Sequence, residues 1–112
     1  MADFAIKQNC LEPDLQATLQ DSAGDAINLT TATVVRFHMR AYGGTTAIID
    51  AEASIVTAAS GIVKYAWAGT DTDTAGKYEG EFEITWSTGE KEIVPNDERD
   101  PYIDIRVLGS LA

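Results

Sequence analysis

The chain has 112 residues, of which 45% are apolar, and its 18 acidic and eight basic side chains give a formal net charge of −10 at pH 7. This length is typical of one domain, and no stretch approaches the roughly 20 apolar residues that a membrane-spanning helix needs. The dispersed Lys and Arg residues on so acidic a chain argue against nucleic acid and anionic membranes as partners. We therefore expect a single domain over residues 1–112.

The first residues show no basic region followed by an apolar run, so we expect no secretory signal. Cys10 is the one cysteine and has no second thiol in the chain with which to form a disulfide. Both features fit synthesis in a reducing cytoplasm.

Apolar residues recur at every second position, which is the period of a strand with one face on a core. In chain order, a hairpin is expected first, with one strand around Leu15, Ala17 and Leu19, a turn over residues 21–25 and a return strand over residues 26–29. The inward-facing residues expected of the later strands are Val35, Phe37 and Met39; Ile49, Ala51, Ala53 and Ile55; Val63, Tyr65 and Trp67; Tyr78, Gly80, Phe82, Ile84 and Trp86; and Ile103, Ile105 and Val107. With a further strand over residues 90–94, the pattern predicts an all-β sandwich or barrel of about seven to nine antiparallel strands and no helix.

No set of side chains suggests catalysis. His38 is the only histidine and falls on the polar face of its strand between Arg36 and Arg40, where a solvated ring is the simplest interpretation. Cys10 is interpreted as a partly buried loop residue rather than a reactive thiol. One histidine and one cysteine cannot supply the four ligands of a structural zinc site. We expect neither an enzyme nor a cofactor.

The loop over residues 69–76 begins like a calcium-binding loop, with Asp71 and Asp73 two residues apart and Gly76 following. Phe82 stands where a bidentate glutamate would be needed, which excludes an EF-hand. A looser site that uses Asp71, Asp73 and Asp97 is a weak candidate. The alternative is that these side chains hydrogen-bond their own backbone and shape the turn.

The run Thr74-Ala75-Gly76-Lys77-Tyr78 resembles the corner before the penultimate strand of immunoglobulin-like domains, in which a tyrosine hydroxyl bonds back to the upstream backbone. Gly80 occupies the position of the second cysteine of antibody domains. This departure excludes the inter-sheet disulfide and implies a sandwich stabilised by packing alone.

A wider likeness covers nearly the whole chain. It rests, in order, on Phe4-Ala5-Ile6-Lys7-Gln8-Asn9, Leu19-Gln20-Asp21, Gly24, Asn28-Leu29-Thr30, Ala32-Thr33-Val34, Phe37-His38-Met39-Arg40, Gly61-Ile62-Val63-Lys64-Tyr65-Ala66-Trp67, Asp71-Thr72-Asp73, Ala75-Gly76-Lys77-Tyr78, Phe82-Glu83-Ile84, Pro95-Asn96 and Ile103-Asp104-Ile105. In order and spacing these segments resemble the amino-terminal, immunoglobulin-like domain of the baseplate upper proteins of tailed bacteriophages.

This resemblance implies a virion structural protein that docks to other phage proteins and to copies of itself. The baseplate proteins usually continue into a helical and receptor-facing portion that these 112 residues do not include, so an accessory protein of the tail, neck or capsid surface fits equally well. The candidate contact residues are Ile48, Val56, Ile62 and Ala66, which the alternation places opposite the expected core. A second buried flank is the other interpretation of these four.

The alternative function is a carbohydrate- or ligand-binding sandwich, with or without calcium, in which Trp67 or Trp86 stacks on a sugar. The alternation places both tryptophans on core faces, which favours burial over ligand contact.

Overall fold

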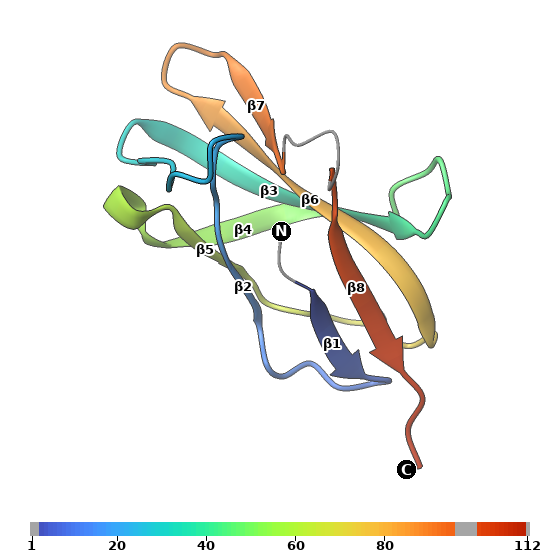
Figure 1. Cartoon of the computed structure of the whole chain (residues 1–112). Coiled ribbons are helices and arrows are strands. Elements are labelled where there is room, and N and C mark those ends of the chain that lie inside the picture. Colours follow the sequence, from blue (N-terminus) through green and yellow to red (C-terminus); the bar gives the residue numbers. More distant parts are fainter. Residues whose placement is uncertain (1–2, 96–100, 112) are drawn as a thin grey trace.

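The computed structural model describes residues 3–95 and 101–111, and this part of the chain is all β, without an α-helix. Its strands are β1 (Phe4–Lys7), β2 (Leu15–Thr18), β3 (Ala32–Ala41), β4 (Ile49–Thr57), β5 (Ile62–Tyr65), β6 (Gly76–Trp86), β7 (Lys91–Val94) and β8 (Ile103–Leu108). The eight strands confirm the predicted all-β class and strand number (Figure 1). One short 3₁₀ turn, Ala58–Ser60, lies between β4 and β5.

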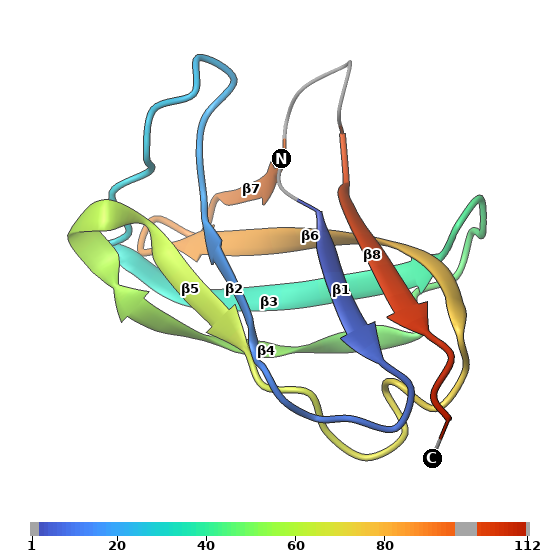
Figure 2. The ribbon, with the colours of Figure 1, turned by 60° about the horizontal axis from the view of Figure 1, so that its bottom comes forward.

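The strands form one sheet in the order β1-β8-β6-β3-β4-β5-β2, and β7 pairs with β6 outside this path. The sheet curls until it is nearly closed, so that its two edge strands, β1 and β2, lie on the same side of the molecule (Figure 2). The prediction that all strands are antiparallel is wrong for one pair, because β1 runs parallel to β8. The sequence analysis also contained no strand at Phe4–Lys7.

Two long strands change partners along their length, and this curls the sheet. β4 pairs with β3 through Ile49 to Ala53, and then with β5 from Ser54 onward. β6 pairs with β8 from Gly76 to Gly80, and with β7 from Phe82 to Thr85. A strand that leaves one neighbour for another bends between two directions, so the inner side chains converge on one core.

The alternation expected from the sequence is present on β3, β5, β6 and β8. Phe37 lies at the centre of the core, with ring centroids 4.8 Å from Tyr65, 5.2 Å from Phe82 and 6.0 Å from Trp67. The fully buried aliphatic residues around these rings include Leu19, Leu29, Val35, Met39, Val63, Ile84, Val94, Ile103 and Ile105. Packing of these side chains is the main stabilising term in a sheet of this kind.

The predicted hairpin between residues 15 and 29 is wrong in its second strand. Only one isolated bridge forms, between Gln20 and Ala26, and β2 pairs instead with β5. The amide of Leu29 donates to Ala58 O, which draws this segment toward the turn between β4 and β5. Burial of Leu29 in the core therefore prevails over local strand pairing.

Ile55 does not face the core as predicted. A register shift between Ile55 and Thr57 interrupts the pairing of β4 with β5, and Ile55 is left 36% exposed. A bulge of this kind re-aims the side chains on either side of it. In the part of the chain that the structure describes, no helix is long and apolar enough to cross a membrane.

Candidate functional site

The four predicted contact residues do not form one patch. Ile48 precedes β4, while Val56 lies near its other end, and the outward-facing Asp50 and Glu52 separate them along the strand. Ile62 is half buried beside β4 at the start of β5, and the exposed Ala66 follows β5. The structure thus leaves three of the four exposed, but on different parts of the surface.

A more compact apolar feature lies where β3 is connected to β4. This connection extends away from the body of the sheet (Figure 1). Tyr42 at its beginning is 68% exposed and Ile48 at its end is 56% exposed. The amide of Ile48 donates to Met39 O at 2.7 Å, and the amide of Tyr42 donates to Lys77 O at 3.0 Å, so the backbone at both residues is fixed. The sequence pattern does not single out Tyr42, because the residue follows the strand and belongs to no alternating pattern.

Asp71 is bound by the chain's own donors. Its Oδ2 accepts the Tyr65 hydroxyl at 2.6 Å and the Ala68 amide at 3.0 Å. Burial, together with the bond to Asp71, raises the pKa of Tyr65 well above that of a free tyrosine. The interpretation that these loop side chains shape their own turn is confirmed at Asp71.

The other weak calcium candidates are not brought to Asp71 by any described contact. Asp73 accepts the hydroxyl of its neighbour Thr74, and Asp97 lies outside the described residues. Within residues 3–95 and 101–111, no three side chains of His, Cys, Asp and Glu are placed to hold a metal ion. Thr72 in the same loop is buried and donates its hydroxyl to Cys10 O at 2.8 Å.

His38 lies between two carboxylates rather than free in solvent. Its Nε2 is 3.3 Å from Asp50 Oδ1 on β4, and its Nδ1 is 3.2 Å from Glu81 Oε2 on β6. The register makes this arrangement, because His38 on β3 pairs with Asp50 on one side and Glu81 on the other. The ring is about one-fifth exposed and links three strands.

The same outer face carries two arginine pairs that flank His38. Arg36 Nε donates to Asp50 Oδ1 at 2.9 Å, and this hydrogen bond lowers the pKa of Asp50. Arg40 Nη2 lies 3.0 Å from Glu79 Oε1, and its guanidinium lies over the ring of Tyr102, 4.5 Å from the centroid. These are cross-strand pairs of opposite charge, which commonly stabilise a sheet.

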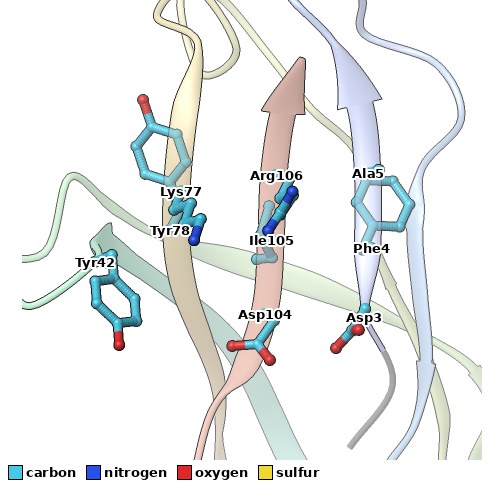
Figure 3. A pocket seen from close by; sticks show the side chains of 9 residues that line it. All are labelled: Asp3, Phe4, Ala5, Tyr42, Lys77, Tyr78, Asp104, Ile105 and Arg106. Carbon is cyan, nitrogen blue, oxygen red and sulfur yellow. The ribbon is translucent and has the colours of Figure 1, made fainter.

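A surface pocket of about 420 Å³ lies over β1, β8 and the first half of β6 (Figure 3). Arg106 and Lys77 lie together toward one end of it, and Asp104 and Asp3 lie at the other end. Tyr42 borders the pocket beside β6. The sequence pattern does not show that these residues lie together, because they come from four separate parts of the chain.

The residues considered for stacking and for thiol chemistry are placed differently. Trp67 is 4% exposed and packs against Phe4, Phe37 and Tyr65, so its ring is not open to a sugar. Trp86 is half buried against the core. Cys10 is exposed, which corrects the expectation that it is partly buried.

No family model matches this chain, and no curated protein sequence matches it.

Proposed function

We propose that this chain is an immunoglobulin-like structural subunit of a bacteriophage virion, in the tail, baseplate or neck. It acts by docking to other virion proteins and to copies of itself, and it catalyses no reaction. The likeness of its ordered sequence segments to the amino-terminal domain of baseplate upper proteins supports this proposal. The Tyr78 hydroxyl supports the immunoglobulin-like part, since it donates to Thr74 O at 2.6 Å, as the tyrosine corner of such domains does.

The observation that carries the docking function is the projecting connection between β3 and β4, with exposed Tyr42 and Ile48 at its two ends. Tyrosine and large aliphatic side chains lose little conformational freedom when they bind and bury much apolar area. At this connection they stand on a backbone that strand hydrogen bonds already fix, so docking costs little ordering of the chain.

The proposal is tested in particles purified from cells that carry the gene. Quantitative mass spectrometry is expected to find the chain in virions at a copy number that matches a symmetric ring. A chain that is absent from particles and monomeric in the cytoplasm overturns the proposal.

A matched pair of variants locates the docking surface. The double variant Tyr42→Ser/Ile48→Ser is expected to reduce incorporation into particles at least about tenfold, since two apolar anchors are worth about 1 kcal/mol or more each. Ile93→Ser removes a similarly exposed apolar side chain from β7 and is expected to leave incorporation unchanged. Circular dichroism of the purified variants verifies that both keep the strand spectrum.

A further inference from the structure

The outer face of β1, β8 and the first half of β6 consists of side chains arranged in rows across the strands. The register sets Arg106 of β8 between Ala5 of β1 and Lys77 of β6. Two residues away along β8, Asp104 lies beside Glu79. Because the side chains of a strand alternate between its faces, these two rows are neighbours on the same outer surface.

Three cations on this face have no carboxylate partner among the residues that the structure describes. Of the seven Lys and Arg residues that the structure describes, four form ion pairs: Arg36 with Asp50, Arg40 with Glu79, Lys64 with Asp14 and Lys91 with Glu83. The other three are Lys7, Lys77 and Arg106, and all of them lie on the outer face of β1, β6 and β8. The chain has an excess of ten carboxylates over cations, so a shortage of acidic side chains does not explain why these three cations are unpaired in the described part of the chain.

The placement of Lys77 directly beside Arg106 has an electrostatic cost. Like charges opposite one another on neighbouring strands destabilise a sheet. Neither side chain has a compensating charge within the described part of the chain. A carboxylate from outside this chain would relieve the repulsion.

The carboxylates of the same pocket are likewise unpaired within the described residues. Asp3 and Asp104 form no ion pair there, and they lie at the end of the pocket away from Arg106 and Lys77 (Figure 3). The face therefore carries unpaired positive charge toward one end and unpaired negative charge at the other.

The geometry points to a second copy of this chain as the occupant of this face. The two copies lie face to face, and the two-fold axis lies in the plane between them, perpendicular to the strands. The strands of the second copy therefore run in the opposite direction. This arrangement places the Arg106 row of each copy over the Asp104 row of the other. Arg106 then pairs with Asp104 of the second copy, and Lys77 lies over Glu79 of the second copy. Such a self-complementary patch is what a two-fold interface requires.

The apolar side chains at the margins of this face add contact area. Tyr42 borders the pocket next to Lys77, and Leu108 on β8 is 39% exposed beside Lys7. Three short strand segments offer less than the roughly 800 Å² per partner of a standard interface. The contact is therefore weak between free copies and becomes effective where an assembly holds copies at high local concentration. This inference rests on the proposed docking function and names one partner for it.

A charge-swap experiment tests the contact. One variant carries Lys77→Glu and Arg106→Glu, and the other carries Asp3→Lys and Asp104→Lys. We expect the wild type to show a concentration-dependent dimer in sedimentation velocity near 0.15 M salt, where charges more than about 8 Å apart are screened. Each variant alone is expected to dimerise at least about tenfold more weakly, and an equimolar mixture is expected to restore dimers.

Differences in net charge cannot explain why each variant alone dimerises weakly while the mixture of the two forms dimers. The two variants carry net charges of −14 and −6, so they repel one another as whole molecules. The control, Lys64→Glu/Lys91→Glu, also has a charge of −14 but is changed on other strands, and it is expected to dimerise like the wild type. Circular dichroism verifies that every variant is folded.

A wild type that is monomeric at about 1 mM, or a mixture that does not associate, overturns the self-contact. If the chain is nevertheless present in virions, the docking function stands with another partner on this face. Absence from virions overturns the docking function, whatever the charge-swap result.

Discussion

Gly80 allows β6 to pass close to the central ring of the core. A Cβ atom at this residue would lie 2.8 Å from Ile105 Cδ1 and 2.9 Å from Phe37 Cε1. Phe37 cannot retreat, because its ring is enclosed by Tyr65, Phe82 and Trp67. The absence of a side chain at residue 80 is therefore a packing requirement and not only a departure from antibody domains.

We expect Gly80→Ala to lower the free energy of unfolding by about 1–3 kcal/mol, the usual cost of overfilling a core. Urea denaturation followed by circular dichroism measures it. Gly109→Ala is the control: this glycine has no neighbouring atom within 4 Å of an added Cβ, so a change within about 0.5 kcal/mol is expected. Equal stability of Gly80→Ala and the wild type would contradict the packing argument.

The Tyr65 hydroxyl fixes the loop between β5 and β6 through Asp71. A hydrogen bond to a charged group contributes about 1.5–3 kcal/mol, so Tyr65→Phe should destabilise the protein by about that much near pH 7. The raised pKa of Tyr65 gives this difference a pH dependence. The stabilisation is complete below the pKa of an unfolded tyrosine, about 10, and is lost above it at up to about 1.4 kcal/mol per pH unit, because only the unfolded state ionises there.

Urea denaturation of wild type and Tyr65→Phe at several pH values between 8 and 11 tests this prediction. The stability difference should narrow above about pH 10, since the other titrating groups are common to both proteins. A constant difference across this range would show that the Tyr65 hydroxyl ionises normally in the folded protein.

Among the strands, β3 is the best supported, since β4 and β6 pair with it on both sides along most of its length. Edge strands β1 and β2 each have one neighbour, and β1 is held to β8 over only four residues. Local opening releases strands with few contacts at less free energy than global unfolding.

Native-state hydrogen exchange should follow this arrangement. Hydrogen-bonded amides of β3 around Phe37 are expected to exchange only through global unfolding, while those of β1 and β2 exchange faster through local opening. Deuterium uptake by individual amides measures both. If β1 amides were as protected as those of β3, the parallel edge would be more firmly bound than its four-residue pairing indicates.

Most strands could be predicted from the sequence, but the pairing between them could not. Alternation identified β3, β6 and β8 and their inward residues, because side-chain period is a local property of a strand. It did not identify β1, which is short and parallel to a strand about one hundred residues further along the chain. Nor did it show that β2 pairs with β5, because any edge offers the same backbone hydrogen-bond groups.

At the scale of the whole molecule, the curled sheet sorts the charged residues into two kinds of surface. On the outer face of β3 and its neighbours, Arg36, Arg40 and His38 each lie beside a carboxylate. On the outer face of β1, β8 and β6, Lys7, Lys77 and Arg106 have no carboxylate partner among the described residues. The acidic excess of the chain favours solubility, while the placement of these three cations supports the proposed two-fold contact.

The predicted site residues also divide into what the sequence pattern predicted and what only the structure showed. Exposure of Ile48, Val56 and Ala66 followed from alternation, but their separation over the surface did not. Asp71 was recognised as a loop carboxylate, and only the structure supplied Tyr65 as its partner.

By itself, the sequence determined the all-β class, the identity of most core residues and the acidic surface, because alternation and composition act within each segment. Tertiary structure alone decided the order of the strands, the near closure of the sheet and the meeting of Lys7, Lys77 and Arg106. These depend on which distant strands share a register. Packing of the entire core selects that register among backbone pairings of similar energy.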